Sequence, residues 1–455
     1  MDRRDQPDSK IIVIASVILI FSVLCFGSVE IWASAIVEAS VLTLVLIWLI
    51  RNRIKHPQNT DIKIIRREEK YMLIALFGLL AYIFIQMLPF PSAVLRYISS
   101  KSFELYSFYA VDKKPLMHIS LYSYNTGIEF LSLLTYSLFF ILLAFSIKDM
   151  RSLVRLLKIL SYFGFVLAVF AILQKATWND KIYWIRQVYE GTPFGPFGNR
   201  NHYAGFIGLL IPLTLGLAFT RRRKERKLLF GFFGVIMAVS LFFSLSRAGI
   251  ISFFGGIAVF GLFISWNKIK TKKILALAAF VSVIFLYLLY LGIDPIVDRF
   301  YQTDMSREAR FAAWADTLPA IKDFFLTGCG LGTYIYVFPL YSTGALVSIL
   351  DHAHNDYLEF ILEAGIIGTI LLLLFLFFFF RTVFQGGWDG RTGIIKMSVL
   401  SSITTIAVHS IFDFNLHIPS NALMLSAVFG MAFAVSRIGN EMSRDISEGK
   451  EKKDL

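Results

Sequence analysis

Long apolar runs alternate with short polar segments along almost the whole chain. A helix needs roughly 20 apolar residues to cross the hydrocarbon layer of a bilayer, which is about 30 Å thick. The pattern predicts membrane-spanning helices near residues 11–28, 30–50, 71–88, 128–147, 158–174, 202–220, 228–245, 249–266, 274–292, 357–380, 397–411 and 420–436. We therefore expect an all-α polytopic membrane protein with about 12 transmembrane helices.

Composition supports this class. The chain has 455 residues, of which 56% are hydrophobic and 17% are charged. Soluble domains carry roughly 25% charged residues, so the polar surface of a soluble protein of this size is missing. The 45 phenylalanines fall mostly inside the apolar runs. The bilayer, rather than a soluble core, sets the length of the segments.

The distribution of positive charge predicts the orientation in the membrane. With a cytoplasmic N-terminus, the inside segments hold 32 of the 45 Lys and Arg residues, although the outside segments are longer. This is the asymmetry of the positive-inside rule. The net charge of +13 then reflects anchoring at anionic lipid headgroups, and we expect no nucleic-acid partner. Both termini are predicted to be cytoplasmic.

Three outside segments are long enough to fold: 89–127, 175–201 and 293–356. The largest has helical spacing from Met305 to Asp323, followed by the flexible turn Gly328-Cys329-Gly330-Leu331-Gly332. No strand precedes this turn, so we do not interpret it as a dinucleotide-binding loop. We expect an N-terminal helical part (1–190), a core (191–436) that includes the 293–356 loop, and a cytoplasmic tail (437–455).

Histidines and arginines gather at the outer ends of the predicted helices. Ionisable residues at these positions are costly without a role, which makes them candidates for a functional site. The topology places the following residues on this one surface, although they are far apart in the chain: His118, Arg200, His202, Arg247, Arg310, His352, His354, His409 and His417.

These residue types suit transfer from a lipid-linked phosphate or pyrophosphate. His354 precedes a predicted helix, whose positive end favours the neutral imidazole that a general base requires. Arg247 and Arg310 offer planar, permanently charged forks that match phosphate oxygens. The alternative is that each residue is a structural cap or an interfacial anchor.

A metal site is a second alternative. His352, His354 and Asp356 offer ligands close together, but the spacing fixes no complete ligand set, so we expect no metal. Asp356, Glu359 and Glu363 share one face of the following helix. This carboxylate stripe must face protein or a cavity, and we expect it to pair with the arginines.

Five segments of the chain form a set of recognisable motifs. One is His354-Asn355, followed by nine residues and Gly365-Ile366-Ile367-Gly368. The other four are Gly198-Asn199-Arg200-Asn201-His202, the turn Ser244 to Gly249, Arg310 through Gly332, and His409 to Pro419 with Asp413. Together they resemble the O-antigen ligase and polymerase family of bacterial surface-polysaccharide assembly, and the first resembles its ligase signature. The resemblance covers residues 190–420, and the first 190 residues are similar only in hydropathy.

The resemblance implies a glycosyltransferase of the bacterial inner membrane with a periplasmic active site. Glycan would pass from undecaprenyl pyrophosphate to a hydroxyl of lipid A-core, with inversion and without metal, cofactor or nucleotide sugar. His354 would be the base, and Arg247 and Arg310 would hold the pyrophosphate. Residues that match the family or lie nearby are possible supporting groups: Asn199, Arg200, His202, His352, Asn355, Glu363 and Asp413.

The acceptor stays open in this interpretation. Polymerases of the same family extend a glycan on its own carrier, and related enzymes glycosylate proteins. The signature spacing favours the ligase. A flippase or transporter of lipid-linked glycans is the alternative from another class, although the polar residues lie at one face rather than at mid-membrane.

Overall fold

The computed structural model describes residues 6–55, 66–109, 115–188, 191–221, 223–266, 271–291, 298, 305–344, 350–388 and 390–447. Every one of the expected membrane helices is present. They are α1 (Gln6–Leu24), α2 (Ile31–Lys55), α3 (Arg67–Gln86), α6 (Ser123–Ser146), α7 (Met150–Ala176), α8 (Arg200–Thr220), α9 (Lys224–Phe243), α10 (Arg247–Trp266), α11 (Thr271–Leu291), α15 (Asp356–Phe384), α16 (Gly390–His409) and α17 (Pro419–Ser447).

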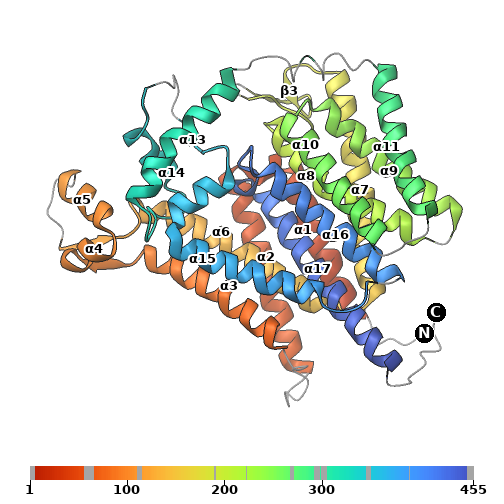
Figure 1. Cartoon of the computed structure of the whole chain (residues 1–455), viewed down its shortest axis with the longest axis horizontal. Coiled ribbons are helices and arrows are strands. Elements are labelled where there is room, and N and C mark those ends of the chain that lie inside the picture. Colours follow the sequence, from red (N-terminus) through yellow and green to blue (C-terminus); the bar gives the residue numbers. More distant parts are fainter. Residues whose placement is uncertain are drawn as a thin grey trace.

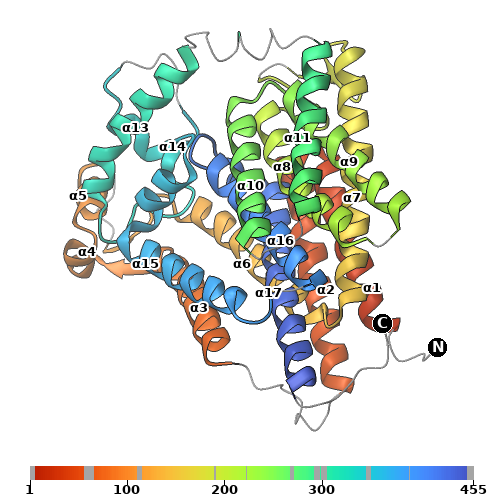
Figure 2. The same cartoon turned by 45° about the vertical axis from the view of Figure 1, so that its right-hand side comes forward.

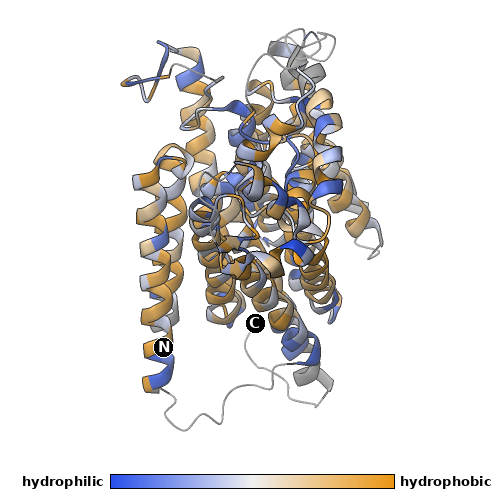
Figure 3. Ribbon diagram, turned by 90° about the vertical axis from the view of Figure 1, so that its left-hand side faces the viewer, coloured by the Kyte–Doolittle hydropathy of each residue, from blue (hydrophilic) through white to orange (hydrophobic). Residues whose placement is uncertain are grey.

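Hydropathy confirms an all-α polytopic membrane protein. Within the described ranges, 9 helices are long and apolar enough to cross a membrane, and α1 and α11 contain shorter apolar stretches, Ser9–Leu24 and Leu275–Ile284. Figure 3 shows apolar residues along the helices and hydrophilic ones mainly toward the ends and in the segments beyond them. Apolar side chains can face lipid here, so exposed hydrophobic residues are expected on the outer helices.

Three helices form the centre of the bundle. The membrane-spanning window of α8 is 89% buried inside the protein and those of α16 and α17 are 83% buried, whereas that of α2 is 28% buried. Figures 1 and 2 show α16 and α17 running between α6 on one side and α8 and α10 on the other. The ends of these central helices therefore lie among many neighbours, where polar groups can be held away from lipid.

The three long segments predicted to lie outside the membrane contain secondary structure in their described residues. The first contains β1 (Pro89–Pro91) paired antiparallel with β2 (Leu116–His118), and the helices α4 (Ser92–Ile98) and α5 (Ser100–Tyr109). The second contains the short hairpin of β3 (Lys181–Ile182) and β4 (Arg186–Gln187). The third contains α13 (Met305–Asp323), α14 (Tyr334–Val337) and the 3-10 helix η3 (Phe338–Leu340). Two further 3-10 helices are η2 (Phe26–Ser28) and η4 (Asn415–His417). Figure 1 shows α13 and α14 beside the start of α15.

A break in α15 explains one glycine of the ligase-like signature. Gly365 has φ of 61° and ψ of −171°, a conformation that side chains rarely allow. A Cβ at this residue would lie 2.4 Å from the backbone nitrogen of Gly328. Across the break, Gln86 of α3 donates to the carbonyl oxygens of Thr327 and Glu363 at 2.8 and 2.9 Å. The break therefore docks the glycine-rich turn against the membrane helix that follows His354.

Candidate functional site

The candidate base lies in the turn that opens α15. Asn355 caps this helix, because its side-chain oxygen accepts from the backbone N–H groups of Tyr357 and Leu358 at 3.0 and 3.1 Å. His354 precedes the cap and has φ of 50°. A non-glycine residue in this left-handed region costs of order 1 kcal/mol or more, and such residues cluster at functional sites. The cap and the strained turn hold the imidazole at the end of the bundle.

His354 contacts a buried carboxylate from a distant segment. Its Nδ1 lies 3.2 Å from Oδ1 of Asp413, which is 0% exposed. The backbone N–H of Phe414 donates to the same oxygen at 2.9 Å. Burial raises the pKa of Asp413, but the hydrogen bond from His354 and the charges of His202, His354 and Arg310 outweigh it and hold this pKa well below its usual range. Asp413 is therefore ionised, and its contact with Nδ1 fixes the orientation of the imidazole.

Phe414 lies at the centre of the histidine cluster. Its ring centroid lies 4.3 Å from that of His352, 4.8 Å from that of His354 and 4.9 Å from that of His202. These three imidazoles come from the 350–355 segment and from α8. One aromatic side chain thus sets the relative positions of three predicted site residues.

The loop helix α13 is docked on the same turn. The indole Nε1 of Trp314 donates to the carbonyl oxygen of Ala353 at 2.9 Å. One turn earlier, Nη1 of Arg310 donates to the carbonyl oxygen of Phe412 at 3.1 Å. Arg310 therefore lies next to Asp413 in space. This contact leaves further N–H groups of the guanidinium for an anionic ligand.

The segments that open α8 and α10 also meet. Asn199 caps α8 by accepting from the backbone N–H of Asn201 at 2.9 Å, and Ser246 donates to the side-chain oxygen of Asn201 at 2.8 Å. Arg200 and Arg247 are the first residues of these two helices. The structure thus joins the Gly198-to-His202 segment and the Ser244-to-Gly249 turn at the same end of the bundle as His354.

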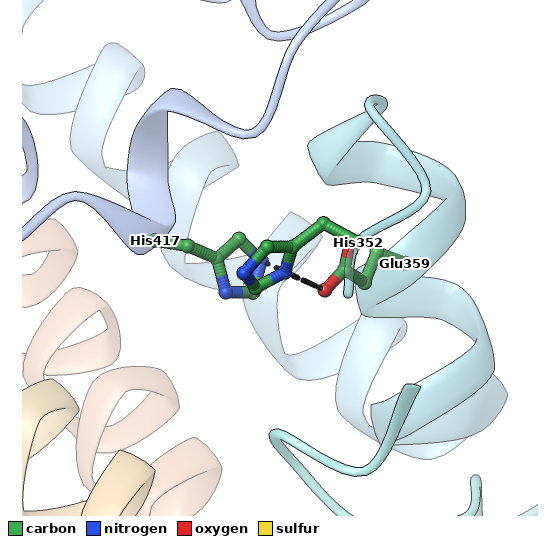
Figure 4. A group of neighbouring side chains, drawn as sticks. All are labelled: His352, Glu359 and His417. Carbon is green, nitrogen blue, oxygen red and sulfur yellow. Dashed lines mark hydrogen bonds and ion pairs between the residues drawn. The ribbon is translucent and has the colours of Figure 1, made fainter. Parts of the chain in front are cut away.

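A second polar network lies beside the base. Nδ1 of His352 lies 2.7 Å from Oε1 of Glu359, and Nε2 of His417 lies 3.4 Å from the same oxygen. Figure 4 shows the two imidazoles overlapping in the view, with the Glu359 carboxylate beside the ring of His352. Although burial lowers it, the charge and hydrogen bond of Glu359 raise the pKa of His352 to about 9. Burial lowers the pKa of His417 to about 4. His352 is thus a charged partner of Glu359 at neutral pH rather than a free base.

This network is also the one group in the described ranges whose spacing could hold a metal, with its three ligand atoms within 4.8 Å of one another. It is not the set considered from sequence, because His354 turns instead toward Asp413. The group satisfies its own charges, since Glu359 also accepts from the backbone N–H of Ala353 at 2.8 Å. The arrangement is that of an ion-paired network.

The described contacts of the carboxylate stripe on α15 are with histidines and with backbone N–H groups. Asp356 lies 3.8 Å from Nε2 of His417 and accepts from the backbone N–H of Leu416. Glu363 is 1% exposed and accepts from the backbone N–H of Tyr334 at 2.8 Å. This contact ties the carboxylate of Glu363 to α14, so Glu363 supports the loop rather than the base.

Sequence reasoning missed the roles of Phe414, Glu359 and His417. Phe414 lies one residue beyond Asp413 in a family-like segment, but no local pattern separates it from the many other phenylalanines. Glu359 belongs to the predicted carboxylate stripe and His417 to the predicted outer surface. Their contact spans 58 residues of sequence, and only the tertiary fold brings them together.

These features define a class: a polytopic membrane protein in which a histidine, a buried aspartate and an arginine lie together at one end of the helix bundle. Comparison with known families makes the assignment specific. Residues 232–373 match the family model described as O-antigen ligase, which supports the resemblance of the five segments. The match includes Arg247, Arg310 and His354. No curated protein matches the chain.

Proposed function

We propose that the protein transfers a glycan from undecaprenyl pyrophosphate to an acceptor hydroxyl at the periplasmic face of the inner membrane. The family supports a membrane glycosyltransferase of the O-antigen ligase or polymerase type. The observation that carries the proposal is the His354–Asp413 pair, at 3.2 Å, beside Arg310. A histidine oriented by a buried carboxylate is suited to take a proton from a hydroxyl.

In the proposed reaction, Nε2 of His354 accepts the proton of the acceptor hydroxyl. The acceptor oxygen forms a bond to the anomeric carbon of the donor sugar as the bond from that carbon to the pyrophosphate oxygen breaks. Asp413 stabilises the imidazolium, and Arg310 and Arg247 stabilise the negative charge that grows on the departing pyrophosphate. Attack opposite the leaving group inverts the anomeric centre.

The acceptor we propose is lipid A-core, because the signature spacing from His354 to Gly365 is that of the ligases. A growing glycan chain or a protein hydroxyl would use the same base and the same leaving group. These activities are distinguished by measuring transfer from lipid-linked donor to each acceptor in turn with the purified protein. Transfer to lipid-linked glycan alone would make the protein a polymerase.

The base is tested with purified variants. A positioned general base contributes about 10²- to 10⁴-fold, so His354→Ala should lose that much transfer while still binding donor lipid. His352→Ala should lose much less, because His352 is the ion-pair partner of Glu359. His118→Ala, an outer-face histidine of β2, is the matched control and should transfer normally. Normal transfer by His354→Ala would end the histidine-base mechanism, and translocation of the donor without transfer would favour a flippase.

A further inference from the structure

A basic cavity lies at the end of the bundle opposite the histidine cluster. Its volume is about 900 Å³, and the ends of α8, α9, α11, α16 and α17 surround it. The 21-residue helix α8 separates it from His202 by about 30 Å. Among the described residues, its charged lining is entirely cationic: Arg221, Arg223, Arg226, Lys227, Lys273 and Arg391.

Arg221 is the residue of this lining that points to an anionic ligand. Among the described residues, two of its guanidinium nitrogens, Nε and Nη2, are buried and have no hydrogen-bond partner. Its described contact is with the ring of Phe230, 5.4 Å from the guanidinium carbon. Burial and the like charges of Arg391 and Arg226 lower the pKa of Arg221. Burying guanidinium nitrogens without hydrogen-bond partners is unfavourable, and an anionic group that accepts from both nitrogens would remove that cost.

The shape favours an amphiphile over a free ion. Phe219, Ile394 and Met442 add an apolar wall to the cationic lining. A phosphate group alone would leave this wall and most of the volume unused. The cavity also lies where helices end, which is the level of lipid headgroups, and the charge asymmetry of the sequence predicts that this face is cytoplasmic.

We propose that this cavity is a binding site for the phosphate headgroup of an anionic membrane lipid, with Arg221 as its central ligand. The phosphate oxygens would accept from the buried nitrogens of Arg221, and the surrounding cations would add charge. The site is separate from the glycan-transfer site and does not depend on the proposed reaction.

The test is thermal unfolding of the purified protein in neutral detergent. Phosphatidylglycerol should raise the Tm of the wild type, whereas phosphatidylcholine and inorganic phosphate at equal concentration should not. Arg221→Gln should bind phosphatidylglycerol about ten- to a hundredfold more weakly, the loss expected for a charge-assisted hydrogen bond. Arg151→Gln removes an exposed arginine from the same face, outside the cavity, and should respond as the wild type.

The Tm of the Arg221→Gln variant without lipid distinguishes lipid binding from a structural role of Arg221. Because Arg221 has like-charged neighbours and no hydrogen-bond partner for two nitrogens, its loss should not lower the Tm of the lipid-free protein. A large fall in that Tm would overturn the proposal in favour of a structural arginine. An unchanged response of Arg221→Gln to phosphatidylglycerol would also overturn it, as would full stabilisation by inorganic phosphate.

Discussion

Replacing Asp413 by Asn tests the proposed catalytic pair without removing its volume. Asp413 is buried, and its Oδ1 accepts from the backbone of Phe414 at 2.9 Å and lies 3.2 Å from Nδ1 of His354. An amide oxygen can keep the bond from Phe414, so the local backbone should hold. The negative charge opposite the imidazole is lost.

The size of the effect follows from the hydrogen bond. A charge-assisted hydrogen bond contributes about 1.5–3 kcal/mol, which corresponds to about 10- to 150-fold in rate when it acts in the transition state. The 3.2 Å separation is at the long end of the range for N–H···O bonds, which favours the lower half of that interval. Because the imidazolium forms only as the hydroxyl is deprotonated, kcat should fall and KM should change little.

The assay is glycan transfer from lipid-linked donor by purified Asp413→Asn, with thermal unfolding as the control for folding. Since the pKa of Asp413 is depressed in the folded protein, its charge stabilises the fold above the unfolded value of about 4. This contribution is lost as the pH falls below about 4, so the difference in Tm between wild type and Asp413→Asn should shrink there. A variant that transfers at the wild-type rate would refute the orienting role of Asp413.

Three further predictions concern the arginines, the orientation and the second network. Arg310→Lys and Arg247→Lys should each lower transfer about tenfold or more, since lysine cannot form the forked contact with pyrophosphate; wild-type rates would make both residues interfacial anchors. In a chain without its native cysteines, Tyr124→Cys should react with an impermeant thiol reagent in cells whose outer membrane has been permeabilised, and Glu225→Cys should not; the reverse pattern would invert the proposed orientation. The pKa of His352 is raised to about 9, so its stabilising contribution is complete below the unfolded value of about 6.5 and is lost as the pH rises through 9. The Tm advantage of wild type over His352→Gln should therefore disappear near pH 10, and a constant advantage would contradict the ion pair.

The membrane fold could be predicted from the sequence because it depends on local properties. Each helix was recognisable from one apolar run of sufficient length, and each run has a helix in the structure. Capping was local too: Asn199 and Asn355 act on backbone groups two or three residues away. The residues of the candidate site could also be predicted from the sequence, because the topology places the ends of many helices on one surface.

The pairing within the site was decided by tertiary structure. Two carboxylates close to His354 in sequence, Asp356 and Glu359, are on α15 and turn toward His417. The carboxylate that contacts His354 is Asp413, which is 59 residues away. Hydropathy determines that a helix end reaches the outer face, but it does not determine the rotation of each helix about its axis. That rotation is set by packing among α8, α15, α16 and α17, and it selects which acid orients the histidine.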